Sequence, residues 1–145
     1  MSDLKQQIQS DLTKARKARD KVRTECLSMT LSEMRNREIE LGGELDDEGV
    51  MQVVTKAVKQ RRDAATQMRE GGRTDLAEKE EAEVAILEAY LPEQLDDDAV
   101  REIIRGIVDG GADQMGPLMG QLMPKIRGRF DGKRAQKLVR EALDS

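Results

Sequence analysis

Basic side chains gather between positions 125 and 140, where they could bind a polyanion. Lys125, Arg127 and Arg129 stand at alternate positions around Gly128, a residue type that allows a tight turn. Lys and Arg donors pair with phosphate oxygens without needing any contact to a base edge. We therefore predict a nucleic-acid-binding surface in this region. Its residues are Lys125, Arg127, Arg129, Lys133, Arg134, Lys137 and Arg140.

The second part of this cluster has the spacing of a single helical stripe. Lys133, Lys137 and Arg140 fall at i, i+4 and i+7, opposite the apolar positions Ala135 and Leu138. With four or five phosphate contacts, the log–log salt slope of binding would be about −3 to −4, at ~0.7–0.9 per phosphate. The alternative interpretation is a solvated helix face whose charges only complement the helix dipole.

A second basic group lies in the stretch KAVKQRRDAA. Lys56 and Lys59 share a helix face with Asp63, and with Arg62 they form a secondary basic face. Arg61 projects closer to the apolar stripe, from which it could reach the acidic helix that follows. Packing with intramolecular ion pairs is the interpretation that we favour for this group, and an anion-binding face is the alternative.

The net charge of −4 hides an uneven distribution of charge along the chain. Residues 1–37 carry nine basic and five acidic residues, and residues 116–145 carry seven and three, so each segment has a charge of +4. Residues 38–115 carry nine basic and 21 acidic residues, a charge of −12. Because electrostatic fields in physiological salt fall off over roughly 8 Å, local patches decide binding, and the acidic pI does not exclude a nucleic acid.

The chain contains no histidine, which excludes Ser-His-Asp and Cys-His nucleophile arrangements and the commonest metal ligand. No G-x-x-x-x-G-K-[ST] loop is present, and the carboxylates of GGELDDEG lack the alternate spacing of an EF-hand. The acidic runs at 78–83 and 96–98 lie near expected helix N-termini, where negative charge is favoured. We predict no catalytic residue, no metal site and no cofactor. Cys26 is predicted to be a small core residue.

Apolar residues recur at three- and four-residue spacing along the chain, and no strand-like alternation interrupts them. The spacing predicts an all-α protein. Four long amphipathic helices are expected first, over about residues 4–19, 20–40, 47–70 and 74–91. Asp20 and Thr74 can serve as N-caps for two of them. Pro92 ends the fourth, because proline lacks a backbone donor and restricts the residue before it.

Pro92 also marks the predicted boundary between an N-terminal helical domain, residues 1–92, and a C-terminal three-helix module, residues 93–145. Three apolar stripes follow it, each as wide as a bundle core requires. The N-caps expected for these helices are Asp96, Asp113 and Asp131. A module of about fifty residues is near the lower limit for independent folding, so we expect its stability to be modest.

Four stretches resemble a known family in their order and spacing. They are KQRRDA, LAEKEEAEVAILEAYLPEQL, MGPLMGQLMPKIRGR and DGKRAQKLVREAL. On these motifs the chain resembles a YqeY-type protein of the GatB/YqeY domain family over nearly its whole length. The YLPEQL junction and the pattern MGxLMxKxxGRxDG carry most of the resemblance. It implies an all-α fold, with an N-terminal domain of long helices joined to a three-helix C-terminal domain.

The resemblance also implies kinship with the tail of the B subunit of the tRNA-dependent amidotransferase. That tail grips tRNA while other subunits convert Glu-tRNA or Asp-tRNA to the amidated form. By this resemblance, residues 125–129 and 131–137 occupy the places that face RNA. Pro117 stands where family members often have lysine, and residues 134–136 depart from the usual sequence. Because the amidation chemistry belongs to other domains of that enzyme, we expect no turnover by this chain on its own.

We predict a non-catalytic helical module that binds tRNA or structured RNA. It would be accessory to tRNA-dependent amidation, with glutamine as amido donor, or to aminoacylation, with a synthetase or an amidotransferase as protein partner. The alternative is a protein–protein adaptor that uses its long helices or the methionine-rich helix with Met115, Met119 and Met123. The sequence has no membrane-spanning run and no signal-peptide layout, so we expect a cytoplasmic location. It does not indicate an oligomeric state.

Overall fold

The computed structural model describes residues 2–144, which form seven helices and no strand. The helices are α1 (Asp3–Lys17), α2 (Lys21–Leu41), α3 (Asp47–Glu70), α4 (Thr74–Glu88), α5 (Asp97–Asp109), α6 (Met115–Ile126) and α7 (Gly132–Asp144). The all-α prediction is confirmed. The chain divides into two compact units, one that ends at Leu91 and one that begins at Pro92. None of these helices combines the length and the apolar character that a membrane crossing requires.

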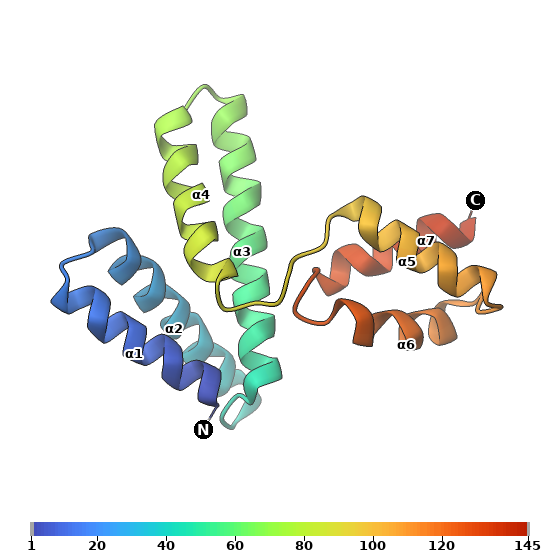
Figure 1. Cartoon of the computed structure of the whole chain (residues 1–145), viewed down its shortest axis with the longest axis horizontal. Coiled ribbons are helices and arrows are strands. Elements are labelled where there is room, and N and C mark those ends of the chain that lie inside the picture. The colour runs from blue at the N-terminus through green and yellow to red at the C-terminus, as the bar shows by residue number, and fades with distance from the viewer. Residues whose placement is uncertain (1, 145) are drawn as a thin grey trace. The chain divides into compact units, whose positions relative to one another are not determined.

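In the first unit α1 and α2 form one helical hairpin, and α3 and α4 form another (Figure 1). Helix α3 contacts each of the other three helices. The apolar spacing that predicted these helices supplies their common core, since the residues at three- and four-residue intervals are the buried ones. The core includes Ile8, Leu12, Leu27, Met34, Val50, Val54, Val58 and Leu87.

Short polar side chains set several of the helix starts in this unit. The Asp20 carboxylate accepts a hydrogen bond from the Arg23 N–H at 3.1 Å, and Asp46 accepts one from the Gly49 N–H at 2.8 Å. Each bond satisfies a backbone donor that has no partner inside the helix. Gly42 ends α2 in the left-handed region, with φ of 75°, where a side chain would be strained. The expected cap at Asp20 and the expected end of α2 are confirmed.

In the second unit each of α5, α6 and α7 contacts the other two, forming a three-helix bundle (Figure 1). The buried residues are Val100, Ile104, Ile107, Leu118, Leu122, Ile126, Ala135, Leu138 and Val139. Asp96 caps α5 by accepting from the Ala99 N–H at 2.7 Å. Asp131 does the same for α7, where it accepts from the Arg134 N–H at 3.0 Å. These two caps were predicted from the sequence.

The expected limits of α4 are wrong at both ends. Thr74 is the first residue of the helix and not its N-cap. Arg73 occupies the N-cap position, and its side chain makes no capping hydrogen bond. The helix ends at Glu88, before the proline acts on it. The Tyr90 N–H donates to the Leu87 carbonyl at 3.1 Å, so the last turn has already tightened to three-residue spacing ahead of Pro92.

The expected cap of α6 is also wrong. Gln114, not Asp113, occupies the N-cap position, and it makes no side-chain cap bond. The turn after α5 explains the shift. Gly111 has a φ of 109°, and the Ala112 N–H reaches back to the Ile107 carbonyl at 3.3 Å. The chain therefore enters α6 one residue later than the sequence pattern indicated.

Candidate nucleic-acid interface

Helix α7 carries the basic stripe that the spacing predicted. Ala135, Leu138 and Val139 are buried against the bundle. Lys133, Lys137 and Arg140 are exposed, and they point away from those three residues because they lie half a helical turn from them. Within residues 2–144 none of the three basic side chains makes a hydrogen bond or an ion pair. They are therefore available to a ligand from solvent.

Arg134 belongs to the same helix but has a partner within the unit. Its Nη2 donates to Asp97 Oδ2 at 2.6 Å and its Nε to Oδ1 at 3.4 Å. This hydrogen-bonded fork holds the pKa of the Asp97 carboxyl below its usual range and raises that of the Arg134 guanidinium. The pair ties the first turn of α7 to the first turn of α5. We assign Arg134 a positioning role, since its donors are directed at a carboxylate.

The Arg129 side chain likewise donates hydrogen bonds within its own unit. Its Nε donates to the Glu93 carbonyl at 2.9 Å and its Nη1 to the Lys125 carbonyl at 3.3 Å. The turn before it is formed by Gly128, with φ of 73°, whose carbonyl accepts from the Gln94 side-chain amide at 2.8 Å. The Arg129 guanidinium therefore holds the 93–95 segment against the turn between α6 and α7.

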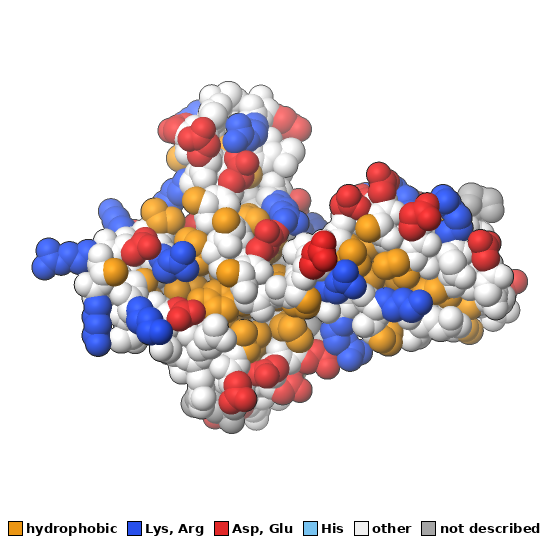
Figure 2. Space-filling view, in the orientation of Figure 1, with side chains coloured by type: hydrophobic (Ala, Val, Ile, Leu, Met, Phe, Trp, Pro, Cys, Tyr) orange, Lys and Arg blue, Asp and Glu red, His pale blue; other side chains and the backbone are white. Residues whose placement is uncertain are grey.

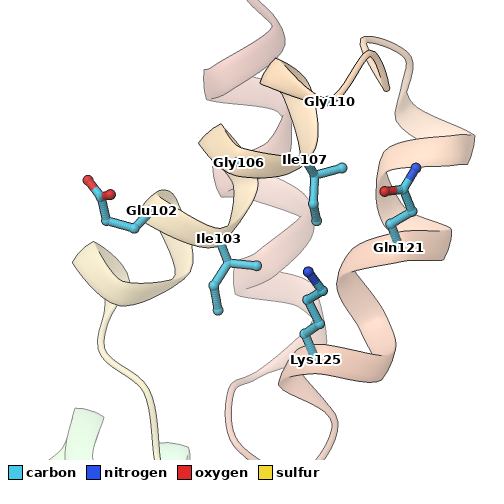
Figure 3. Close-up of a pocket in the computed structure, with 7 residues that line it drawn as sticks. All are labelled: Glu102, Ile103, Gly106, Ile107, Gly110, Gln121 and Lys125. Atoms are coloured by element: carbon cyan, nitrogen blue, oxygen red, sulfur yellow. The ribbon is translucent and has the colours of Figure 1, made fainter.

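Lys125 and Arg127 are both exposed at the end of α6. Lys125 does not join the stripe on α7, because it lines a shallow groove of about 340 Å³ between α5 and α6 (Figure 3). The stripe faces away from both of those helices. The seven predicted cations therefore do not form one surface. Three lie on the outer face of α7, two hold the unit together, one lies in the groove, and Arg127 follows directly after α6.

The secondary basic face is largely occupied by intramolecular ion pairs. Lys59 Nζ lies 2.8 Å from Asp63 Oδ2, and Arg62 contacts Glu88 of α4. Lys56 is exposed. The geometry agrees with the packing interpretation for two of the three predicted residues.

Arg61 reaches across to α4, as its position near the apolar stripe indicated. The side chain is 6% exposed, and its Nε lies 3.4 Å from Oε2 of Glu83, which is 9% exposed. Its Nη1 donates to the Ala57 carbonyl at 3.0 Å, and its Nη2 contacts the Met29 sulfur at 3.6 Å. The guanidinium thus joins α2, α3 and α4 in the interior of the first unit.

Cys26 lies beside this pair as a fully buried free thiol, and its predicted place in the core is confirmed. Its Sγ is 3.8 Å from the Glu83 carbonyl. Burial raises the pKa of the thiol to about 11, so almost no thiolate forms at neutral pH. A nucleophilic role for Cys26 has no support in this environment.

A family model of YqeY-like proteins matches residues 5–143, which is nearly the whole chain. The chain belongs to the YqeY-like protein family. The resemblance drawn from the four motifs is thereby confirmed, and it places both helical units inside one family domain.

Curated relatives of this YqeY-like chain occur in yeasts under the name "Altered inheritance of mitochondria protein 41, mitochondrial". The protein of Lachancea thermotolerans is 34% identical over 85 residues, which are 58% of this chain and 46% of the relative. The protein of Kluyveromyces lactis is 36% identical over 84 residues, 57% of this chain and 45% of the relative. The aligned part thus spans less than half the length of these relatives. Their names place those proteins in mitochondria, and a cytoplasmic location for this chain stays a prediction.

Two features of this YqeY-like protein were missed by reasoning from the sequence. The pairing of Arg134 with Asp97 joins residues 37 positions apart, and no local sequence pattern predicts it. The groove between α5 and α6 did have a signal, which is Gly106 in the interior of a predicted helix, where a better helix former would be expected. Met115, Met119 and Met123 are half-buried and pack against the core of the second unit, so they are neither free nor fully enclosed.

Proposed function

We propose that this YqeY-like protein is a non-catalytic module that binds structured RNA through the outer face of α7. The observation that carries the proposal is the exposed stripe of Lys133, Lys137 and Arg140, none of which makes a hydrogen bond or an ion pair within the described residues. Three cations on one helical face, at i, i+4 and i+7, match a ligand with regularly spaced negative charge.

The chemistry of the stripe supports backbone recognition rather than base readout. Lysine and arginine side chains pair with phosphates, and a duplex RNA region presents phosphates and 2′-hydroxyls along its accessible groove. Stacking of unpaired bases has little support, since Tyr90 and Phe130 are the only aromatic residues of the chain and both are partly buried.

The resemblance of the C-terminal motifs to the amidotransferase tail directs the proposal toward tRNA. A module of this kind would hold tRNA for an amidotransferase or an aminoacyl-tRNA synthetase, and it would not itself perform the amidation. Arg129 and Arg134 contribute by holding α7 in place against the 93–97 segment.

The test is binding of bulk tRNA to the full chain across a salt series, measured by filter retention. A Lys133→Ala/Lys137→Ala/Arg140→Ala variant should bind more weakly, and its log–log salt slope should be shallower by about 2–3, at ~0.7–0.9 per lost phosphate contact. The matched control is Lys14→Ala/Lys17→Ala/Lys21→Ala, which removes the same charge from exposed positions of the first unit. Equal slopes for the wild type and the α7 variant would reject the proposal.

The second candidate is the protein–protein adaptor, which a different observation favours. Helix α2 exposes four large apolar side chains, with exposed fractions of 39% for Val22, 57% for Met29, 72% for Ile39 and 56% for Leu41. Figure 2 shows apolar side chains on the surface among charged ones. An adaptor would keep its full activity in the α7 variant, whereas an RNA-binding module would lose it.

A further inference from the structure

The groove between α5 and α6 is built from few side chains. Its lining residues are Glu102, Ile103, Gly106, Ile107, Gly110, Gln121 and Lys125 (Figure 3). Ile103 and Ile107 supply the apolar part, two glycines leave the α5 wall low, and Gln121 and Lys125 form the α6 wall one helical turn apart. The volume of about 340 Å³ is near the lower end for a pocket that encloses a ligand, so the groove suits the insertion of one or two side chains.

Gly106 is a glycine of a helix interior that lines the groove. It lies inside α5, where glycine costs about 0.5–1 kcal/mol relative to alanine. A Cβ built on it would meet no atom within 4 Å. Neither close packing nor a positive φ requires glycine at this position. The missing side chain leaves the helix backbone open to close approach from outside.

The charge inside the groove comes from Lys125. Figure 3 shows its side chain extending from α6 toward α5, while Glu102 points away from the groove. Glu102 is also neutralised by Arg105, whose Nη1 donates to Glu102 Oε1 at 2.8 Å. A guest would therefore meet an apolar floor, an open stretch of backbone and one ammonium group.

We propose that this groove docks one amphipathic α-helix of a partner protein, with an acidic side chain of that helix paired to Lys125. Helix α5 has 13 residues and α6 has 12, so each wall is about 18–20 Å long at 1.5 Å per residue. A guest helix of three to four turns fits between them as a fourth helix of the bundle. Its apolar side chains rest on Ile103 and Ile107, and its backbone approaches α5 at Gly106.

The same observations disfavour RNA as the occupant. Lys125 is the one basic residue in the groove lining and Glu102 the one acidic residue, so the groove lacks the several cations that a polyanion would pair with. The cationic stripe on α7 lies on the other side of the bundle. The groove and the stripe are therefore separate sites, and a partner helix could bind while RNA is bound.

The experiment uses a displayed library of random amphipathic helical peptides, 12–16 residues long, selected against the full chain. Selected peptides should carry an acidic residue at a fixed helical spacing from a small or apolar face. A Gly106→Leu variant, whose Cβ would meet no atom within 4 Å and which favours the helix, places a side chain at the groove and should bind the peptides about tenfold more weakly or worse, a loss of at least about 1.4 kcal/mol. The matched control is Gly120→Leu, an exposed glycine inside α6 that does not line the groove and also has no atom near its Cβ. It should leave the affinity unchanged.

Charge reversal at Lys125 tests the proposed pairing directly. Selection against a Lys125→Glu variant should replace the acidic position of the enriched peptides with a basic one. The proposal is overturned if no peptides enrich, if the enriched peptides bind the Gly106→Leu variant as well as the wild type, or if their charge preference ignores Lys125→Glu. A loss of tRNA binding in Gly106→Leu, with peptide binding intact, would assign the groove to RNA and overturn it too.

Discussion

Cations in the first unit and cations on α7 have opposite surroundings, although the same residue types occur in both. Arg61, Arg62 and Lys59 each lie against a carboxylate, and Arg61 is enclosed by three helices. Lys133 and Lys137 are exposed and make no hydrogen bond or ion pair in residues 2–144. The acidic helix α4 packs on α3 and supplies the carboxylates of Arg61 and Arg62, and Asp63 of α3 itself supplies that of Lys59, whereas within the second unit the stripe lies on the side of α7 opposite its buried residues.

This comparison shows why a count of basic residues does not locate a binding surface. The charge of a cation is largely neutralised by a carboxylate within hydrogen-bonding distance. If the pair is buried, breaking it lowers the free energy of unfolding; if the pair is exposed, it contributes little measurable stability. A cation without a partner keeps its field for a ligand. Arg134 is the intermediate case, because it lies on α7 but pairs with Asp97 at the start of α5.

The largest effect is expected from Arg61→Ala. The change leaves the Glu83 carboxylate buried without its partner, so the free energy of unfolding should fall by about 3–5 kcal/mol. Urea denaturation followed by circular dichroism measures it. As a control, Arg61→Leu/Glu83→Leu removes both charges and should recover much of the lost stability. A loss below 1 kcal/mol for Arg61→Ala would show that the pair is solvated and that the contrast with α7 is smaller than the structure indicates.

A smaller and pH-dependent effect is expected from Arg134→Ala. The pair with Asp97 is partly exposed, so its loss should cost about 0.5–1 kcal/mol at neutral pH. Because Arg134 holds the pKa of Asp97 below its ordinary value of 3.8, the stabilisation is complete above that pH and is lost as the pH falls through the folded-state pKa. The free energies of unfolding of the wild type and the variant should therefore converge as the pH falls below 3.8 and through the folded-state pKa of Asp97. A constant difference down to pH 2 would exclude Asp97 as the partner.

The smallest effect on stability is expected from the α7 stripe. The Lys133→Ala/Lys137→Ala/Arg140→Ala variant removes exposed groups that make no hydrogen bond or ion pair in the described residues, so its free energy of unfolding should stay within about 0.5 kcal/mol of the wild type. Combined with a weakened affinity for tRNA, this result would separate binding from folding. A loss above 1 kcal/mol would mean that the stripe serves the fold, as the paired cations of the first unit do.

Most of the fold could be predicted from the sequence, because it rests on short-range patterns. The apolar spacing identified every helix, and α3 begins and ends where the acidic start and the glycine stop indicated, at Asp47 and Glu70. The caps at Asp20, Asp96 and Asp131 follow from the same local chemistry. The errors at α4 and α6 arose where the turn geometry, rather than a capping side chain, set the helix limit.

The candidate site was less predictable, because a side chain's partner depends on tertiary packing. The helical period correctly placed Lys133, Lys137 and Arg140 on one face. It could not show that Arg129 turns back onto the Glu93 carbonyl or that Lys125 lies in the groove between α5 and α6. Those contacts join segments about 20 to 40 positions apart, and no pattern in either segment reports the other.

The hydrogen bonds around the turn that precedes α7 set a practical limit on how the second unit can be dissected. The Leu95 N–H donates to the Arg129 carbonyl at 2.9 Å, next to the bonds from Gln94 to Gly128 and from Arg129 to Glu93. A fragment that starts at the first residue of α5 would lose all three hydrogen bonds, and the turn between α6 and α7 would no longer be held by the segment that precedes α5. An excised bundle intended for isotope labelling or screening should therefore retain the residues from Glu93 onward.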